Sequence, residues 1–229
     1  VLNMLSEAKI KFVIKNLKAS FKNNMPLCFS YFRKRKIGIL GGSFNPAHSG
    51  HIHISNTAKI NLGLDEIWWL VAPQNRLKSN IGMESFKKRL SYARILTSKY
   101  HFIKVLDLEE KNKLYASYKT VNFLSRKSQT VKFIWLMGSD ILDNFNKWLY
   151  PSFITKKFPV AVISRPGYIS SFTNSNNVPK LGKRIKPSKS KVIFLKKKPI
   201  WIFIKQKLLA VSSSEIRRLK HLNNMDSKK

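Results

Sequence analysis

The sequence of 229 residues contains a single cysteine, Cys28, so it can form neither an intrachain disulfide nor a multi-cysteine zinc site. It also lacks an apolar run long enough to cross a bilayer, because its most apolar stretches, residues 66–73 and 158–164, have the length of β-strands. These absences favour a folded protein of the reducing cytoplasm, with no transmembrane segment.

Acidic residues are also scarce: 11 Asp and Glu stand against 44 Lys and Arg, which gives a formal net charge of +33. Such a field concentrates anions, including nucleotides, pyrophosphate, nucleic acid and acidic lipid. A compositional bias towards lysine explains the same numbers equally well, so the charge alone selects no partner. Hydrophobic residues make up 43% of the chain, enough for one globular domain with a sizeable core.

The first 35 residues differ in character from the rest. Residues 10–21 form a basic, amphipathic, helix-like stretch, and a cluster of four basic residues follows at 33–36. Lysines interrupt the apolar run, which argues against a signal peptide. We expect residues 1–35 to be a basic N-terminal extension of low order and residues 36–229 to be one domain.

From residue 36 onwards, short apolar runs alternate with helical patterns. Strands are expected at residues 37–40, 66–72, 102–108, 131–137, 158–164, 192–195 and 200–204. Helices are expected at 46–62, 84–100, 118–126, 141–148 and from Ser213, whereas residues 169–190 have loop composition. This alternation predicts a Rossmann-like α/β domain, with a parallel sheet covered by helices on both faces. Ligands of such sheets bind at the carboxyl ends of the strands.

Residues 41–51 read GGSFNPAHSGH and join the first expected strand to the first expected helix. Gly41 and Gly42 let the backbone approach a ligand closely, and a helix N-terminus offers free N–H groups to phosphate. His48 and His51 are three residues apart, so on a helix they would share a face and could act on one polyphosphate. The string is neither a Walker A loop nor the Gly-x-Gly-x-x-Gly fingerprint.

The segment His-Ser-Gly-His matches the His-x-Gly-His signature of the nucleotidyltransferase superfamily. The longer string resembles that of bacterial nicotinate-nucleotide adenylyltransferases, whereas phosphopantetheine adenylyltransferases usually carry Thr at the position of His48. A second stretch, VSSSEIRRL at residues 211–219, is similar to the family's Ile-Ser-Ser-Thr-x-Ile-Arg motif, which grips the ATP phosphates. In this stretch Ser212 and Glu215 have capping-box spacing, which predicts a helix start.

Other segments resemble the family less closely. Gly138 and Asp140, with Trp148 eight residues beyond Asp140, are similar to a Gly-x-Asp segment and a following Trp that help to form the nucleotide pocket. Lys78 lies in a stretch that resembles a substrate loop, although Arg76 replaces the usual Pro. Asp140 could equally be a helix N-cap and Trp148 a core residue.

The resemblance implies transfer of the adenylyl group of ATP to nicotinic acid mononucleotide, a step of NAD biosynthesis. Mg²⁺ would be held mainly by the ATP phosphates, with no metal site of the protein's own. The implied catalytic residues are His48, His51 and Arg217. The implied ATP and phosphate contacts are Gly41, Gly42, Ser43, Phe44, Ser213 and Ser214. The implied contacts to the mononucleotide and dinucleotide are Asn45, Lys78, Gly138, Asp140 and Trp148.

Two alternatives stay open. The acceptor could be nicotinamide mononucleotide or another phosphate ester, because the motifs do not separate these substrates. A different class, a basic nucleic-acid-binding protein, is suggested by the charge and by the basic segments 33–36 and 180–198. No helix-turn-helix, zinc-finger or RRM signature supports that class, so we expect no specific nucleic-acid partner. The sequence leaves the oligomeric state open.

Overall fold

A computed structural model describes residues 34–73, 82–126, 130–165 and 181–205 of the chain. All of these except Lys34 belong to the structural unit Arg35–Lys229. The expected N-terminal extension lies outside the described residues, apart from its last two positions, and stays a prediction.

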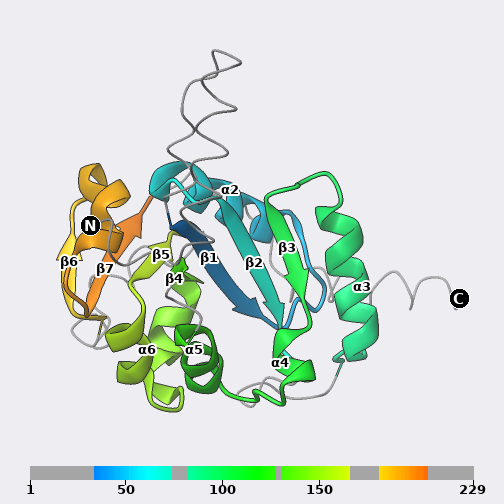
Figure 1. The fold of residues 1–229 in the computed structure, drawn as a ribbon. Helices are drawn as coiled ribbons and strands as arrows, with labels where there is room; N and C mark the ends of the chain where they lie inside the picture. The colour runs from blue at the N-terminus through cyan, green and yellow to red at the C-terminus, as the bar shows by residue number, and fades with distance from the viewer. Residues whose placement is uncertain (1–33, 74–81, 127–129, 166–180, 206–229) are drawn as a thin grey trace, which may run out of the picture. The chain divides into compact units, whose positions relative to one another are not determined.

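Seven parallel strands form the centre of the molecule (Figure 1). They are β1 (Arg35–Gly42), β2 (Glu66–Val71), β3 (Ile103–Leu106), β4 (Val131–Gly138), β5 (Val160–Ile163), β6 (Lys183–Ile185) and β7 (Ile200–Ile204). Their order across the sheet is β3-β2-β1-β4-β5-β7-β6, and every neighbouring pair runs parallel. The expected Rossmann-like α/β fold is confirmed.

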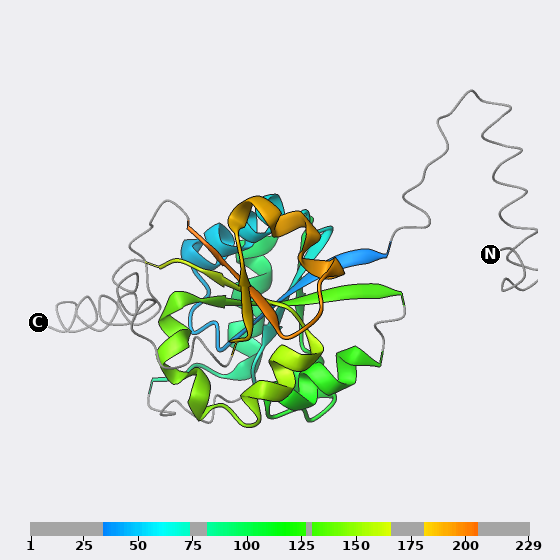
Figure 2. The same cartoon turned by 90° about the vertical axis from the view of Figure 1, so that its left-hand side faces the viewer.

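Helices cover both faces of the sheet, as the edge-on view of Figure 2 shows. One layer contains α2 (Ser49–Leu62), α3 (Phe86–Thr97) and the 3-10 helix η5 (Pro187–Leu195). The other contains α5 (Ser117–Ser125), the 3-10 helix η3 (Ser139–Lys147) and α6 (Pro151–Lys157). The short α4 (Leu108–Lys111) packs against the same core through Leu108. In β4, Ile134 and Leu136 face the first layer and Phe133 and Trp135 the second, because side chains alternate along a strand.

Several boundaries differ from the expectation. The first helix begins at Ser49 rather than at residue 46, because His48 is its N-cap and a turn precedes it. The expected helices at 84–100, 118–126 and 141–148 are confirmed in shorter or shifted form as α3, α5 and η3. The short helices α4 and α6 were not expected at all.

The expected strand at residues 192–195 is wrong, because these residues lie in η5. Ile193 is buried but Val192 and Leu195 are exposed, and a short apolar run does not by itself distinguish a strand from a helix. The expected loop at 169–190 is also wrong in its last part, which contains β6 and the start of η5. Both β6 and the start of η5 consist mostly of exposed polar and basic residues, which resemble a loop in composition.

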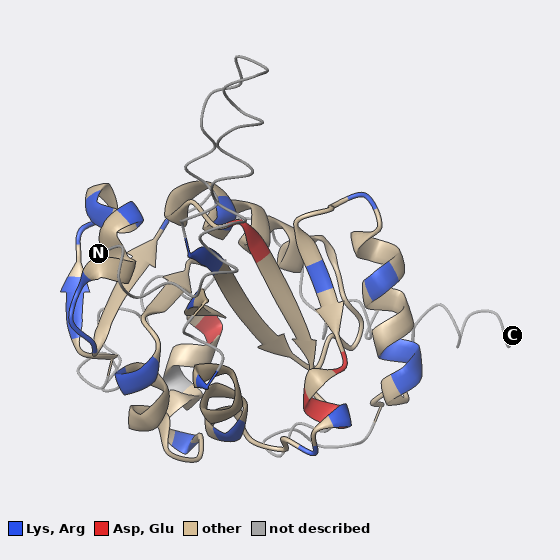
Figure 3. Cartoon of the chain, in the orientation of Figure 1, with Lys and Arg blue, Asp and Glu red and all other residues tan. Residues whose placement is uncertain are grey.

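Strand β6 forms one edge of the sheet and exposes Lys183 and Arg184. The ribbon of this edge strand is largely in the colour of Lys and Arg in Figure 3. Charged side chains on an edge strand oppose pairing with another sheet. Part of the basic segment 180–198 therefore has a structural explanation that needs no nucleic acid. No helix within the described ranges is long and apolar enough to cross a membrane.

Glu109 of α4 is 7% exposed and accepts a 2.7 Å hydrogen bond at Oε1 from Oγ1 of Thr120 in α5. Burial raises the pKa of this carboxyl from 4.5 to about 7, although the hydrogen bond from Thr120 opposes the shift. Since the unfolded chain releases this proton at a lower pH than the folded chain, ionisation of Glu109 favours unfolding.

We therefore expect Glu109 to contribute a loss of stability as the pH rises from 4.5 to about 7. Its size should be about 3 kcal/mol, from the shift in pKa between the two states. Urea unfolding of the wild type and of Glu109→Gln over this range measures it as the difference between the two curves. Parallel curves would contradict the assignment.

Candidate functional site

Strand β1 lies at the point where the chain reverses its direction across the sheet, between β2 on one side and β4 on the other. The carboxyl ends of β1 and β4 therefore lie side by side, and in sheets of this kind the gap between such strands binds ligands. Residues 43–48 leave β1 here and lead into the N-terminus of α2.

Two histidines close the N-terminus of α2 by reciprocal hydrogen bonds. Nδ1 of His48, the N-cap residue, accepts from the Gly50 N–H at 3.1 Å, and Nδ1 of His51 accepts from the His48 N–H at 3.2 Å. The two rings lie 4.0 Å apart between centroids. The expected pair is thus brought together, but by a capping box with imidazoles in place of hydroxyl and carboxylate rather than by a shared helical face.

These hydrogen bonds also fix which ring nitrogen carries the proton. A nitrogen that accepts a backbone N–H has no proton of its own, so a neutral imidazole bonded in this way must carry its proton on Nε2. The cap therefore makes Nε2 of both His48 and His51 a hydrogen-bond donor whenever the ring is neutral.

His48 is 4% exposed, and its Nε2 has no hydrogen-bond partner among the described residues. Burial, together with the smaller effect of the Arg165 charge, lowers the pKa of His48 from 6.5 to about 4. Near neutral pH the ring is uncharged and presents a buried N–H donor. Such a donor is costly to leave unpaired, which is the pattern expected of a group that awaits an acceptor from a ligand.

Phe44 holds the loop before the helix in an uncommon conformation. Its φ is +46°, a left-handed value that a bulky residue rarely adopts. Its ring stacks on Trp69 of β2 at 4.8 Å and contacts His51 at the same centroid distance. Trp69 donates to Ser55 Oγ, which donates to the His51 carbonyl, so core packing reaches directly to the histidine pair.

The other loop residues are positioned by the backbone. Gly41 and Gly42 end β1, and a Cβ on Gly42 would lie 3.4 Å from the Phe44 ring. The Ser43 carbonyl accepts from Arg89 at 2.6 Å. The buried Asn45 donates from Nδ2 to the Gly82 carbonyl and accepts at Oδ1 from the Glu84 N–H. These bonds connect the Asn45 side chain to the backbone of the segment before α3.

At the end of β4, Gly138 lets the Asp140 and Arg165 side chains approach the backbone more closely than a residue with a Cβ would allow. A Cβ there would collide with Asp140 Oδ1 and would crowd the Arg165 side chain. Asp140 pairs with Arg165 at 3.0 Å, and the Arg165 N–H donates to Ser139 Oγ. Asp140 Oδ1 is buried without a partner among the described residues. Asp140 therefore does not cap η3, whose N-cap is Gly138.

Trp148 is half-buried at the end of η3, where its ring packs against Trp135 and Phe145. These contacts belong to the core on the α5 and α6 side of the sheet, opposite the core that contains Phe44. The remaining predicted site residues lie outside the described residues: Lys78, Ser213, Ser214 and Arg217.

Sequence reasoning missed Arg89 and did not include Arg165 among the site residues. Arg89 is 1% exposed although it lies on a surface helix, beside Leu90 on the apolar face. A charged residue at a buried helical position was a usable signal, since such a group almost always has a specific set of partners. Arg165 lies two residues after the apolar strand β5, at the carboxyl edge of the sheet where the histidines also lie.

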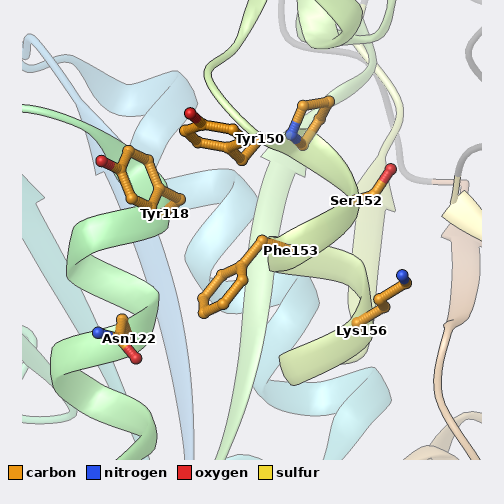
Figure 4. A pocket seen from close by; sticks show the side chains of 7 residues that line it. Tyr118, Asn122, Tyr150, Ser152, Phe153 and Lys156 are labelled. Atoms are coloured by element: carbon orange, nitrogen blue, oxygen red, sulfur yellow. The ribbon is translucent and has the colours of Figure 1, made fainter.

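A cavity of about 650 Å³ lies elsewhere, between α5 and α6 (Figure 4). Tyr118 and Asn122 line it from α5, and Tyr150, Phe153 and Lys156 line it from the other side. None of the predicted site residues lines this cavity. We therefore assign the candidate site from the polar groups at the ends of β1 and β4 rather than from this cavity.

The capping geometry predicts how stability depends on pH. Because the folded-state pKa of His48 is lowered, protonation favours unfolding, and stability should fall by about 3 kcal/mol as the pH drops from 6.5 to about 4. Glu109 acts with the opposite sign over nearly the same range, so the wild type should show little net dependence.

Unfolding curves separate the two groups. Glu109→Gln should become more stable as the pH rises from 4 to 6.5, since only the His48 effect remains. His48→Asn, which keeps an N-cap side chain, should become less stable as the pH rises to about 7. The free energy of unfolding of the double variant should not change with pH over this range. A remaining pH dependence would mean that another group titrates.

Comparison with known proteins agrees with this geometry. The cytidylyltransferase-like family model matches residues 39–219. A probable nicotinate-nucleotide adenylyltransferase of Agrobacterium fabrum is 36% identical over 79% of this chain and 97% of its own. One from Rhizobium johnstonii is 38% identical over 79% of this chain and 91% of its own. The nicotinic acid mononucleotide adenylyltransferase of Plasmodium falciparum, solved with NaAD, shares the fold with a TM-score of 0.58 and 22% identity over 80% of this chain and 83% of that one. Since the family model spans most of the chain and these relatives are matched over nearly their whole length, this chain belongs to the nicotinate-nucleotide adenylyltransferase family.

Proposed function

We propose that this chain transfers the adenylyl group of ATP to nicotinic acid mononucleotide and releases nicotinic acid adenine dinucleotide and pyrophosphate. The observation that carries the proposal is the buried, unpartnered Nε2 of His48, held beside His51 at the N-terminus of α2. Two imidazole donors and a helix N-terminus form a site for a polyphosphate rather than for a cation.

In the reaction, a 5′-phosphate oxygen of the mononucleotide attacks the α-phosphorus of ATP. The bond from the α-phosphorus to the bridging oxygen breaks, and pyrophosphate leaves with the electron pair. No enzyme nucleophile is needed, so catalysis consists of positioning and of stabilising charge that develops on the phosphate oxygens. His48 and His51 donate from Nε2 to those oxygens.

The other roles follow from position and from family resemblance. Gly41, Gly42, Ser43 and Phe44 would line the phosphate side, while Gly138, Asp140 and Trp148 would lie towards the mononucleotide. Asn45 would act through the loop, since both polar groups of its side chain bind the backbone. Arg217, Ser213 and Ser214 would hold the leaving pyrophosphate, and Lys78 would bind the substrate phosphate.

Mg²⁺ would reach the site on ATP. Within the described ranges, no three His, Cys, Asp or Glu side chains gather as metal ligands. The groups at the end of β1 are hydrogen-bond donors, which suit phosphate oxygens and not a cation. We therefore assign the ion's ligands to phosphate and water. We place the reaction in the cytoplasm.

The acceptor can be tested directly. Purified protein with ATP and nicotinic acid mononucleotide should form the dinucleotide, and nicotinamide mononucleotide should react more slowly at the same concentration. Chromatography of the products together with pyrophosphate release distinguishes the two. Equal or greater use of the amide would replace the acceptor in this proposal, and no dinucleotide from either would reject it.

His51→Ala should lower kcat by about a hundredfold or more, because a phosphate donor is lost and the His48 N–H loses its capping partner. Steady-state rates of pyrophosphate release measure the effect. His101→Ala is the matched control, since His101 is exposed in the turn before β3. Near-normal turnover of folded His51→Ala would refute this role.

A further inference from the structure

Arg89 of α3 donates four hydrogen bonds, all of them to backbone carbonyls. Nη1 donates to Ser43 at 2.6 Å and to Ala72 at 2.8 Å, Nη2 donates to Pro73 at 2.8 Å, and Nε donates to Glu84 at 3.0 Å. Although the side chain is 1% exposed, none of these acceptors is a carboxylate. Carbonyl dipoles thus supply every hydrogen bond to the charge, which also lies 5.7 Å from the centre of the Phe86 ring and is favoured at longer range by Glu110.

These carbonyls come from three places in the fold. Ser43 follows β1, Ala72 and Pro73 follow β2, and Glu84 precedes α3. One guanidinium therefore fixes the carboxyl ends of two neighbouring strands relative to each other. Hydrogen bonds from a charged donor are about twice as strong as neutral ones, so this set resists displacement of the Ser43 carbonyl.

The position of that carbonyl determines the direction of the next N–H. The Ser43–Phe44 peptide is trans, so its C=O and N–H point in opposite directions. Because the carbonyl points towards Arg89, the Phe44 N–H points away from it. The backbone hydrogen bonds among the described residues include none from this N–H.

We propose that Arg89 is a positioning residue for phosphate binding: by holding the Ser43 carbonyl, it aims the Phe44 N–H at a phosphate oxygen of ATP. This inference rests on the proposed function, and it assigns to Arg89 a part in catalysis without contact to the substrate. It also accounts for the left-handed backbone of Phe44, since the carbonyl before this residue is held by Arg89 and its own ring is held by Trp69.

Lysine could not replace Arg89 in this role. A guanidinium offers five N–H donors in a rigid fork, whereas an ammonium offers three from one point and cannot reach four carbonyls spread around a plane. Arg89→Lys should therefore behave more like Arg89→Ala than like the wild type, even though it keeps the charge.

Kinetics provide the first test. Arg89→Ala should lower kcat by about a hundredfold, with a smaller change in KM, because a displaced donor affects the transition state most. Added methylguanidinium should restore part of kcat by filling the vacated space. Leu90→Ala, at a buried position next along the same helix, is the control for lost stability and should keep kcat near the wild-type value. A loss of kcat no greater than that of Leu90→Ala would overturn the proposal. So would a methylguanidinium effect that raises the melting temperature of Arg89→Ala but does not restore kcat.

The amide resonance of Phe44 provides the second test and does not depend on turnover. In ¹⁵N-labelled wild type it should shift on addition of ATP. In Arg89→Lys, or Arg89→Ala where that variant folds, the resonance should differ without ATP and respond less to it, while Leu90→Ala should match the wild type. Absence of the shift in the wild type, or an unchanged response in the Arg89 variants, would reject the role of Arg89. Wild type that forms no dinucleotide yet shows the shift would reject the proposed function and leave only the positioning of the Phe44 N–H for ATP binding.

Discussion

The site depends on the reciprocal hydrogen bonds between His48, His51 and the first turn of α2. The usual capping box closes this end with a hydroxyl and a carboxyl or carboxamide side chain, and a carboxylate would repel an anion. Imidazoles satisfy the same backbone donors and keep a second nitrogen for a ligand. One set of bonds thus stabilises the helix, fixes the tautomers and directs two donors to one side.

Packing from the core supports that arrangement. The cap would have little orienting value if the loop before it could move, and three contacts prevent this: Phe44 stacked on Trp69, Asn45 bonded to the segment before α3, and Arg89 bonded to the Ser43 carbonyl. Trp69 and Arg89 are buried residues of a neighbouring strand and helix, and Asn45 is itself buried. The strained φ of Phe44 is maintained by these contacts, as expected where the backbone adopts an uncommon conformation at a functional site.

The sequence was sufficient to predict the parallel sheet, six of its seven strands nearly as they occur, and the meeting of His48 and His51. These follow from local pattern: buried runs such as that of β4 have strand length, and the loop motif is contiguous. What it could not predict depends on contacts between distant residues. Arg89 reaches a carbonyl 46 positions away, and Arg165 lies 25 positions from Asp140. The exposed β6 and the apolar run in η5 were misjudged because burial on a sheet edge depends on neighbours that sequence does not identify.

The surroundings of His48 explain why its imidazole is neutral. Burial and the charge of Arg165 both oppose its protonation, so the positive potential that attracts a triphosphate comes from fixed sources: the helix N-terminus and the guanidinium groups. A neutral N–H is far less costly to bury without a partner than a cation, which makes the unpaired Nε2 tolerable before the substrate binds. The division is chemically useful, because attraction at a distance requires charge, whereas alignment of a phosphate oxygen requires a directed donor. In this site the fixed charges supply the attraction, and the neutral Nε2–H of His48 supplies a directed donor.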